Sequence, residues 1–377
     1  MIKIGTFCSG IGSPEQAIKD LNTNHSIEFA CEIDKYARMT YQANHEAKIM
    51  YEDLTKIDYS SLPDVDLFVA GFPCQSFSIA GKRLGFEDTR GTIFFHILEY
   101  LKTKKPDMFV LENVKGLLSH DKRKTFNVII NSLAATVNGQ CLMFPNVDTL
   151  GYNVYYQVLN AKDYGIPQNR ERVFIVGFKN NQAFNFPKKQ KLKLKLKDLL
   201  ESNVDEKYYL SERALKGLMK NNQDIASCLT VGGNSGGNHS DMDILLQKIS
   251  GTNQGDRVYS VNGLASCLGS NGGGGGAKTG LYAIPVLTPN RINKKQNGRQ
   301  FKNDGENMFT LTSQDRHGIY DGYKIRRLTP RECMRLMGFP DSFITPCSDR
   351  QLYKQAGNSI VTNVLKEIFK EMRLKND

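Results

Sequence analysis

The sequence predicts an α/β protein built on a doubly wound, mostly parallel sheet. Short apolar runs alternate with helix-length amphipathic stretches through the first half of the chain. The apolar runs are nearly continuous, which is typical of strands that are buried on both faces of a parallel sheet. This alternation favours a doubly wound fold, in which ligands bind at the carboxyl ends of the strands.

The elements follow one another in a regular order. The first apolar run ends in glycines and leads into an amphipathic stretch, and the same succession recurs along the chain. Every motif described below from the first half of the chain follows one of the expected strands or leads into one. We expect strands at 2–7, 27–30, 65–70, 108–111 and 172–176, and helices at 14–21 and 35–44.

The composition restricts the class of protein. The chain has 377 residues, of which 40% are hydrophobic, so that a sizeable core can form. Its formal net charge is +11 and its pI is about 9.1. A protein this basic often binds polyanions, and nucleic acid is the first candidate. Charge alone leaves open a basic protein that has no such partner.

The cysteines and the hydropathy exclude further classes. The eight cysteines form no C-x-x-C pair and no zinc-ligand spacing, so we expect no metal site and reduced thiols. The N-terminal sequence has no signal-peptide pattern. No apolar run approaches the roughly 18 residues that a membrane helix needs. We therefore expect a cytoplasmic protein that has no membrane partner.

A change of composition after residue 187 predicts the domain organisation. The segment 187–197 alternates Lys with Leu, which suits a half-buried strand and a solvated arm equally well, and the region 232–280 is rich in glycine. Regular amphipathic order returns at Arg326. We predict a main domain at 1–186, an inserted loop-rich module at 187–325 and a return to the main domain at 326–377.

A glycine turn follows the first strand. In Phe7-Cys-Ser-Gly-Ile-Gly-Ser13 the glycines let the backbone approach a ligand, and Glu32 closes the next strand at the distance suited to ribose hydroxyls. NAD-binding and adenosylmethionine-binding folds both use this arrangement, although the spacing departs from the G-x-G-x-x-G pattern of NAD sites. A purely structural glycine turn is the alternative.

A cysteine follows the strand expected at 65–70. In Gly71-Phe-Pro-Cys-Gln-Ser-Phe-Ser78, Pro73 fixes the backbone before Cys74, which suits a nucleophile whose reactive form is the thiolate. A cysteine considered alone is more often a small buried hydrophobe. The neighbouring motifs decide between these two interpretations.

Two further motifs should reach the same edge of the sheet as Cys74. Glu112-Asn-Val114 follows one strand, and Gln168-Asn-Arg-Glu-Arg172 leads into a later one. A buried carboxyl can hold a proton at neutral pH and donate it to a ring nitrogen of a base. Two arginines can orient that carboxyl and bind a base carbonyl or a phosphate. Singly, Glu112 could cap a helix and the arginines could be surface charges, but the motifs together indicate a catalytic site.

Taken in order, these motifs resemble the series found in the cytosine-5 DNA methyltransferases. The series consists of FCSGIGS, Glu32, GFPCQSFS, ENV, QNRER and the closing QAGNSIV, and it covers essentially the whole chain. Other stretches, such as RRLTPRECMRLMGFPDSF, are similar to small bacterial and phage enzymes that modify GC-containing sites. The resemblance implies a class I methyltransferase fold, S-adenosylmethionine as methyl donor, a catalytic main domain and an inserted target-recognition domain.

The resemblance also implies the roles of the catalytic residues. The Cys74 thiolate would add to carbon 6 of cytosine and make carbon 5 nucleophilic, and Glu112 would protonate or hydrogen-bond ring N3. Arg172 resembles the residue that contacts the cytosine carbonyl, and Arg170 the residue that steadies the catalytic carboxylate. The cytosine would be flipped out of the duplex, and the loop 76–91 would close over it.

The cofactor contacts follow from the same resemblance. Glu32 matches the ribose contact and Asp53 the adenine contact. Cys8 stands where relatives often carry an aromatic residue that packs on the cofactor, and Phe7 beside it is expected to point into the core. The expected cofactor-binding residues are Cys8, Ser9, Gly10, Ile11, Gly12, Glu32, Ile33, Asp53, Leu54, Pro73, Asn358 and Ser359.

The inserted module resembles a target-recognition domain. Ser78, Gln254 and Arg257 match DNA-binding positions: Gln254 fills the hole left by the flipped base, and Arg257 reads a guanine. The stretch 285–323 looks like an insertion relative to the family, so the target sequence stays open. We expect double-stranded DNA as the partner and a monomer on DNA, and any cognate restriction endonuclease would act independently.

Three other classes share parts of the pattern. A tRNA cytosine-5 methyltransferase would keep the same catalytic core, but the basic, glycine-rich insertion with Gln254 and Arg257 favours DNA. An NAD-dependent oxidoreductase would leave Cys74 and Glu112 unexplained. A catalytically silent DNA-binding protein would have no need of the intact catalytic motifs.

Overall fold

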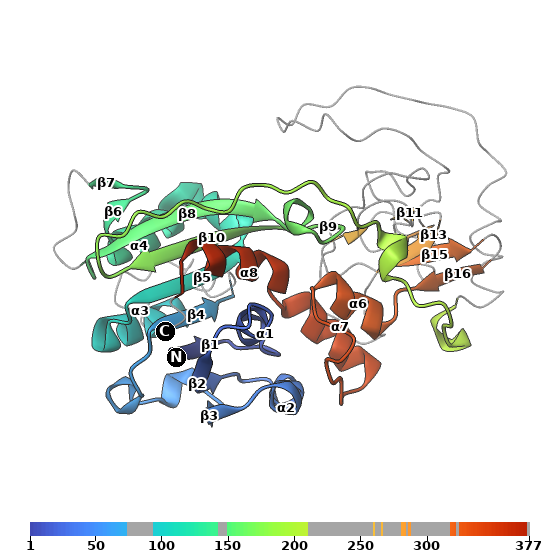
Figure 1. The fold of residues 1–377 in the computed structure, drawn as a ribbon, viewed down its shortest axis with the longest axis horizontal. Helices are drawn as coiled ribbons and strands as arrows, with labels where there is room; N and C mark the ends of the chain where they lie inside the picture. Colours follow the sequence, from blue (N-terminus) through green and yellow to red (C-terminus); the bar gives the residue numbers. More distant parts are fainter. Residues whose placement is uncertain are drawn as a thin grey trace, which may run out of the picture.

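A nine-stranded sheet runs through the centre of the protein, and helices lie on both of its faces (Figure 1). The computed structural model describes residues 1–73, 93–141, 149–209 and 324–374, together with the backbone of five short strands between 259 and 321. This architecture confirms the predicted doubly wound α/β fold. The strand order is β3 (Ala47–Tyr51), β2 (His25–Cys31), β1 (Ile2–Phe7), β4 (Leu67–Gly71), β5 (Met108–Val114), β10 (Glu171–Phe178), β8 (Tyr152–Asn160), β6 (Ala134–Val137) and β7 (Gln140–Cys141).

The sheet is mostly parallel, and its important exception is β10. The first five strands of this order run parallel to one another, whereas β10 runs antiparallel to both β5 and β8. The beginning of β10 therefore lies at the edge where the parallel strands end. β5 extends to Val114, so Glu112 and Asn113 lie within the strand and do not follow it as the sequence predicts. The reason is that β10 pairs with β5 along this whole length.

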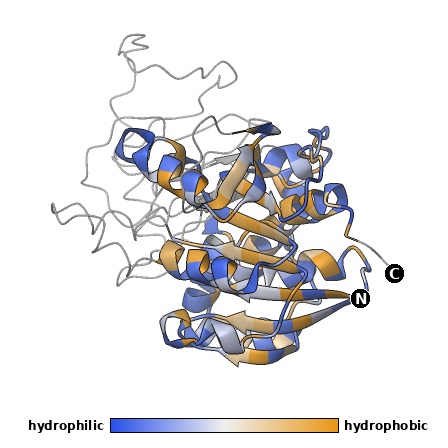
Figure 2. Cartoon of the chain, turned by 90° about the vertical axis from the view of Figure 1, so that its left-hand side faces the viewer, coloured by the Kyte–Doolittle hydropathy of each residue, from blue (hydrophilic) through white to orange (hydrophobic). Residues whose placement is uncertain are grey.

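Two hydrophobic cores hold the helices against the sheet. Alternate residues of each strand enter the two cores: Leu67 and Val69 face one, and Phe68 and Ala70 face the other. Burial on both faces explains why the strands are nearly continuous apolar runs. Figure 2 shows the strands largely in the hydrophobic colour and the helices with blue stripes. One core contains α1 (Ser13–Lys19), α6 (Pro330–Leu336), α7 (Asp349–Asn358) and α8 (Thr362–Glu371), and the other α3 (Ile93–Lys104) and α4 (Lys124–Leu133).

Side-chain caps fix where two of the helices begin. Asp34 accepts hydrogen bonds from the backbone of Tyr36 and Ala37 and thereby starts α2 (Lys35–Asn44). Thr329 and Glu332 form a reciprocal capping box at α6, and Pro330 occupies its first turn. Such caps satisfy backbone donors that have no partner within a helix.

The basic segment 187–197 is not part of any described strand. Its leucines alternate in burial: Leu196 is fully buried in a core, Leu192 is partly buried against it, and Leu194 is 40% exposed. The segment is therefore an extended arm anchored by alternate leucines, a combination of the two forms that the sequence allows. Short 3₁₀ helices follow at Leu196–Leu199 and Glu206–Tyr208.

The inserted region contributes short strands. Within the part of the chain that the structure describes, no helix is long and apolar enough to cross a membrane. The predicted return at residue 326 falls inside β16, and the division into domains stays a prediction. The five-stranded sheet has the order β11 (Tyr259–Ser260), β13 (Gly280–Ala283), β16 (Lys324–Arg327), β15 (His317–Asp321) and β14 (Val286–Leu287), and β12 (Ala265–Ser266) pairs with β9 (Gln168–Asn169).

A buried ion pair joins β16 to α6. Arg326 is 5% exposed and Glu332 is fully buried, and two hydrogen bonds of 2.8 Å connect their side chains. The Glu332 carboxylate also accepts hydrogen bonds from the backbone N–H groups of Glu201 and Thr329. This carboxylate therefore ties the end of the extended arm to the chain that returns from the inserted region.

We predict that Arg326→Met lowers the free energy of unfolding by about 3–5 kcal/mol, because it leaves the Glu332 charge buried without its partner. Urea denaturation measures this change. The matched control is Lys370→Met, which removes the surface ion pair with Glu367 and should cost about 0–1 kcal/mol. Similar losses of unfolding free energy in the two variants would show that the buried pair contributes no more to stability than the surface pair.

Candidate active site

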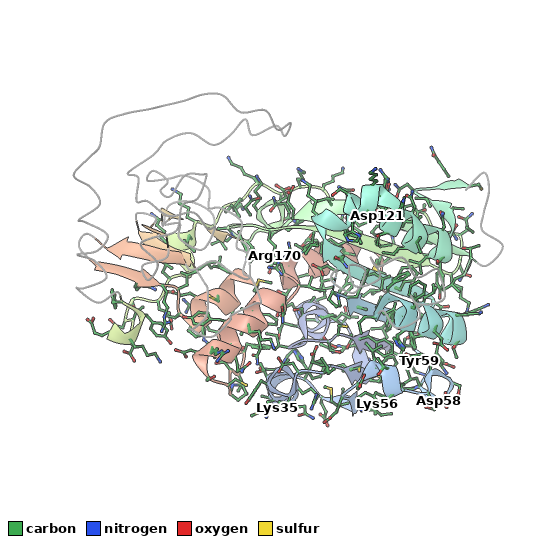
Figure 3. The ribbon with its side chains drawn as sticks, turned by 180° about the vertical axis from the view of Figure 1, so that it is seen from behind. Lys35, Lys56, Asp58, Tyr59, Asp121 and Arg170 are labelled. Atoms are coloured by element: carbon green, nitrogen blue, oxygen red, sulfur yellow. The ribbon has the colours of Figure 1, made fainter. Side chains whose placement is uncertain are left out.

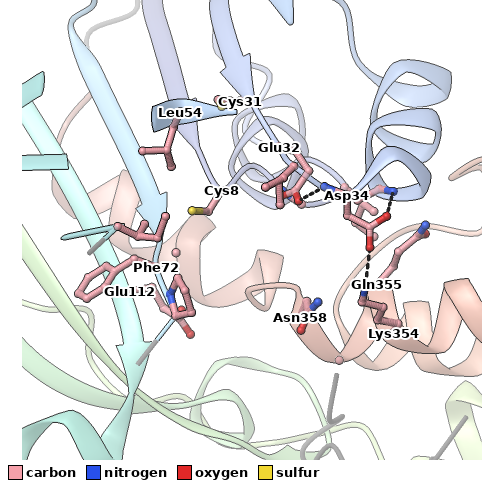
Figure 4. A pocket seen from close by; sticks show the side chains of 18 of the residues that line it. Cys8, Cys31, Glu32, Asp34, Leu54, Phe72, Glu112, Lys354, Gln355 and Asn358 are labelled. Atoms are coloured by element: carbon pink, nitrogen blue, oxygen red, sulfur yellow. Dashed lines mark hydrogen bonds and ion pairs between the residues drawn. The ribbon is translucent and has the colours of Figure 1, made fainter. Parts of the chain in front are cut away.

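A cavity of about 630 Å³ opens at the carboxyl ends of the parallel strands (Figure 4). β1, β2 and β4 are followed at the cavity by Cys8, Glu32 and Phe72, and Glu112 lines it from β5. α7 supplies the wall on the other side, which includes Asn358. The cavity therefore lies where a doubly wound sheet binds its ligands.

The turn after β1 needs glycine at two positions. Gly10 and Gly12 adopt φ angles of 57° and 90°, in the left-handed region that favours glycine. A Cβ at Gly12 would lie 2.2 Å from a ring carbon of His45, so that position also lacks room for a side chain. Cys8 adopts φ 51° without being glycine. The turn brings the Gly10 backbone N–H to the edge of the cavity.

Glu32 is held in place by two backbone donors. Its Oε2 accepts from the N–H of Gly10 at 2.8 Å, and its Oε1 accepts from the N–H of Asp34 at 2.9 Å. Burial raises the pKa of the Glu32 carboxyl, although these hydrogen bonds act in the opposite direction. The result is an acceptor group fixed in one orientation at the cavity wall, which suits a ligand with hydroxyl groups.

The wall beside Glu32 is apolar. Cys8, Leu54 and Ile33 line it, and Ile33 is 75% exposed, so a bound ligand would cover apolar surface that now faces solvent. Burial raises the pKa of the Cys8 thiol far above its usual value, so this thiol stays neutral. Asp53 also lines the wall, where it caps a 3₁₀ helix by accepting from the N–H of Thr55 at 3.0 Å.

Phe7 points away from the cavity, as the sequence predicts. Its side chain is fully buried among the rings of Phe29, Phe68 and Tyr100, with centroids 5.1 to 5.7 Å away. The cavity wall at this turn therefore comes from Cys8 and carries no aromatic ring from Phe7.

Residues from α2 and α7 close the side of the cavity opposite the sheet. Lys354 Nζ lies 2.5 Å from Oδ2 of Asp34, and Gln355 bonds to the side chain of Thr40 and the carbonyl of Tyr36 (Figure 4). The sequence reasoning did not select Asp34 or Lys354. Asp34 carries a signal, since it precedes the helix expected at 35–44, but Lys354 meets a partner 320 positions away and has no local signal.

Glu112 and Arg172 form an ion pair in the cavity. Phe174 lies opposite Glu112 in the β5–β10 ladder and Arg172 lies opposite Val114, so Glu112 and Arg172 are diagonal neighbours on one face. The distance from Arg172 Nε to Glu112 Oε1 is 3.2 Å. On the other side of β5, Gly71 lies opposite Glu112, and a Cβ there would come within 3.5 Å of the carboxylate.

Burial raises the pKa of the Glu112 carboxyl, and the nearby charges of Arg172 and Arg170 only partly offset this effect. Glu112 is 8% exposed. A carboxyl in such a setting can hold a proton at a higher pH than usual and donate it to a neighbouring acceptor.

Arg170 lies between the sheet and the C-terminal helices (Figure 3). Its guanidinium donates to the carbonyls of Gly357 and Ser359 at 3.0 and 2.8 Å, on either side of Asn358. Arg170 is 4% exposed and, like Arg172, lines the cavity. It therefore joins the start of β10 to the cavity wall at the end of α7.

The chain leading to Cys74 is anchored from β5. Asn113 is buried and donates through Nδ2 to the carbonyl of Phe72 at 2.9 Å, and Pro73 lines the cavity. Four expected site residues lie outside the described residues, namely Cys74, Ser78, Gln254 and Arg257.

The structure brings all but three of the expected cofactor-binding residues to the cavity. The exceptions are Ser9, Gly12 and Ser359, which lie behind its wall. The Ser9 hydroxyl bonds to the backbone of Thr6 and Cys31, and the Ser359 hydroxyl donates to the carbonyl of Gln355. In this structure their side chains support the turn and the end of α7.

A buried carboxyl lies behind the glycine turn. Glu15 is fully buried; its Oε1 accepts hydrogen bonds from the hydroxyls of Thr6 and Tyr41, and its Oε2 has no partner. Burial raises the pKa of Glu15. The sequence reasoning did not select this residue, because a glutamate at the start of a helix is an ordinary first-turn residue.

Two solved structures align with this chain over nearly its whole length. DNMT2 from Spodoptera frugiperda aligns with a TM-score of 0.60 and 19% identity over 99% of both chains, and the Entamoeba histolytica methyltransferase EhMeth with a TM-score of 0.61 and 18% identity over 99% of this chain and 98% of that one. At these identities the likeness establishes the fold, which is that of a class I methyltransferase.

The sequence matches the C-5 cytosine-specific DNA methylase family over residues 2–374, and the chain belongs to this family. The orphan methyltransferase M.SPRI of Bacillus phage SPR is 37% identical, over 98% of this chain and 97% of the relative. The type II methyltransferase M.HhaI of Haemophilus parahaemolyticus is 36% identical, over 90% and 85%. The chain is thus a DNA cytosine-5 methyltransferase that uses S-adenosylmethionine, and the resemblance drawn from its motifs is confirmed.

We predict that Glu15→Gln weakens the pH dependence of stability. Because the pKa of Glu15 is raised in the folded protein, the folded state keeps a proton that the unfolded state loses above its ordinary pKa. Glu15 therefore lowers the free energy of unfolding progressively as the pH rises from the ordinary pKa of a glutamate towards the raised pKa of the folded state. A glutamine, which is neutral at every pH, removes this loss. Urea denaturation across acidic and neutral pH should show Glu15→Gln matching or exceeding the wild type at neutral pH.

Glu28 provides a control of opposite sign. It is partly desolvated, but hydrogen bonds from Lys48 and Ser26 lower its pKa, so its contribution is lost as the pH falls. Glu28→Gln should therefore lose stability at neutral pH. A loss at neutral pH in Glu15→Gln as well would show that Glu15 is ionised in the folded state.

Proposed function

We propose that this methyltransferase flips a cytosine out of duplex DNA and methylates its carbon 5 through a covalent adduct with Cys74. Family membership supports the proposal, and one arrangement carries it: the ion pair between the buried Glu112 and the partly buried Arg172 shares a cavity with Glu32. Pro73, to which Cys74 is bonded, lines the same cavity. Groups suited to a base and groups suited to a nucleoside cofactor are therefore adjacent.

The described residues fit S-adenosylmethionine. We assign the ribose hydroxyls to Glu32, whose carboxylate is fixed by two backbone donors. Ile33 and Leu54 offer apolar surface to the purine, and Asp53 lies beside them for the adenine edge. When bound, the cofactor supplies an electrophilic methyl group. The residues of this chain bind it, orient it and activate the cytosine that receives the methyl group.

In the proposed chemistry, a nucleophile that adds to carbon 6 of the cytosine activates carbon 5. The Cys74 thiolate forms a sulfur–carbon bond, and the displaced electron pair is stabilised as Glu112 gives its proton to ring N3. Arg172, held by Glu112, is placed to bind the cytosine carbonyl. After carbon 5 has been methylated, a base removes its proton, the sulfur–carbon bond breaks, and N3 returns its proton to Glu112.

DNA recognition is assigned to residues outside the described part of the chain. We propose that Gln254 fills the space left by the flipped base, that Arg257 reads a guanine and that Ser78 contacts the DNA beside the catalytic loop. The net charge of +11 supports a polyanionic substrate. The residues 187–325 would form the target-recognition domain. A tRNA substrate is less supported, since the DNMT2 likeness concerns the fold.

We further propose that the enzyme acts as a monomer on DNA in the bacterial cytoplasm, independently of any cognate restriction endonuclease. The phage SPR relative is named an orphan methyltransferase, and the Haemophilus relative a type II methyltransferase. Both names describe methyltransferases, and the word orphan in the name of the phage relative supports independent action.

We predict that methyl transfer by the wild type slows as the pH rises through the raised pKa of Glu112, because only the protonated carboxyl can serve N3. Glu112→Gln should be slower by about 10²-fold or more and should lose this pH dependence, since the amide has no proton to give up. Single-turnover assays with labelled S-adenosylmethionine between about pH 6 and pH 9 measure both effects.

The matched control is Glu171→Gln. Glu171 neighbours Arg172 but forms a surface ion pair with Lys115, so this variant should keep the wild-type pH profile. A Glu112→Gln variant with the wild-type rate and profile would refute the proton-donor role.

We predict that 5-fluorocytosine traps the enzyme on DNA. Fluorine at carbon 5 cannot leave as a cation, so the adduct with Cys74 should persist after methylation. Long duplex DNA in which 5-fluorocytosine replaces cytosine, incubated with S-adenosylmethionine, should give a denaturant-resistant complex. Mass spectrometry should locate the linkage in the peptide containing GFPCQSFS.

The variant Cys74→Ala should give no covalent complex, and a complex that persists in it would identify a different nucleophile. The same assay on tRNA carrying 5-fluorocytosine tests the RNA alternative. A stronger covalent band on tRNA than on DNA would overturn the DNA assignment.

A further inference from the structure

Asn160 lies where β8 ends beside the start of β10, and its side chain holds the segment that carries the two arginines. Its Nδ2 donates to Oδ1 of Asn169 at 2.6 Å, and its Oδ1 accepts from the backbone N–H of Arg170 at 3.0 Å. Asn160 is 8% exposed. A single buried amide thus uses its donor and its acceptor to fix two consecutive residues.

The inserted region holds the same segment through a different contact. β9 pairs in parallel with β12, so that Gln168 lies opposite Ala265 and Asn169 opposite Ser266. The Gln168 side chain is fully buried and donates to the carbonyl of Leu336 in α6 at 2.7 Å. β9 therefore forms hydrogen bonds or strand pairing with three elements, namely the end of β8, α6 and strand β12 of the inserted region.

The arginines follow β9 directly. Arg170 is the next residue and bonds to the carbonyls on either side of Asn358, while Arg172 is two positions further and pairs with Glu112. This short and continuous backbone gives neither arginine a flexible linker. A displacement of β9 would therefore act first on Arg170 and, through the adjoining backbone, on the start of β10, where Arg172 lies.

We propose that Asn160 is a positioning residue for the arginine pair, and that the β9–β12 pairing makes this position depend on how the inserted region is seated on DNA. On the correct site β12 keeps β9 in register, and Arg172 meets Glu112. On a wrong site the inserted region is displaced, β9 moves with it, and the ion pair is misplaced. The enzyme then distinguishes correct from wrong sites by the rate of the chemical step as well as by its binding affinity. The inference rests on the proposed function of Glu112 and Arg172.

A double-mutant cycle tests the positioning role. At saturating S-adenosylmethionine, Asn160→Ala should slow single-turnover methylation by about 10-fold or more, because a small misplacement of a catalytic group is costly. In an Arg172→Ala background the same change should cost less than about 3-fold, since the side chain that Asn160 is proposed to position against Glu112 is already lost. Equal losses in the two backgrounds would overturn the positioning role.

Two further variants keep the test decisive if Arg172→Ala does not fold. Asn169→Asp retains an acceptor for the Asn160 amide and should stay near the wild-type rate, whereas Asn169→Leu should lose rate as Asn160→Ala does. The matched control is Asn153→Ala at the opposite end of β8, where Asn153 also hydrogen-bonds through its side chain. It should leave the rate unchanged, and a comparable loss there would point to general damage to β8.

Site discrimination tests the coupling. Unmethylated bacterial DNA amplified in vitro is methylated for short times, and bisulfite sequencing gives the rates at preferred sites and at sites differing by one base pair. The ratio of these rates should fall in Asn160→Ala and in Ser266→Pro, since proline cannot donate to the β9–β12 pairing. An unchanged ratio in both variants would overturn the coupling.

The 5-fluorocytosine assay separates the two levels of inference. If the wild type forms no adduct at Cys74, the proposed function fails. If the wild type forms the adduct and Asn160→Ala loses no rate, the proposed function stands and the positioning role of Asn160 is refuted.

Discussion

The antiparallel pairing of β10 with β5 decides where the chemistry can take place. It places Arg172 diagonally from Glu112 on one face of the sheet. If β10 ran parallel to β5, the residues that lead into it would lie at the amino ends of the strands, away from the cavity. Because β10 is antiparallel, the motif at 168–172, which leads into it, lies at the same edge of the sheet as the motifs that follow the parallel strands.

The sequence predicts the parallel half of the sheet well because its strands are buried on both faces and their apolar runs are continuous. It misses β3, the outer strand of this parallel half, and also β6, β7 and β8, all of which have side chains that are in part exposed. The end of β5 is also misplaced, because Glu112 and Asn113 are polar and only their pairing with β10 shows that the strand continues. A polar residue inside a strand is the expected failure of such reasoning at a functional site.

The residues of the candidate site also fall into two groups: those that a local sequence motif indicates, and those whose role depends on partners that only the fold supplies. Glu32, Glu112 and the arginines are found from the sequence because each belongs to a motif at the end or the beginning of a strand. Asp34, Lys354 and Asn160 are not, because their roles come from partners that only the fold supplies. Asn160 is nine positions from Asn169, yet nothing in the sequence indicates that their amides meet.

The wall that α7 gives the cavity has a consequence for synthesis of the chain. The contact between Asp34 and Lys354 spans 320 positions, so the cavity stays open on one side until α7 has left the ribosome. A chain that has been made only as far as residue 325 therefore lacks part of the proposed cofactor site, and we expect it to gain little stability from S-adenosylmethionine, since a ligand stabilises only the state that binds it. Because residues 187–325 are translated before α7, a chain that has just completed the proposed cofactor cavity already possesses the region proposed to select DNA.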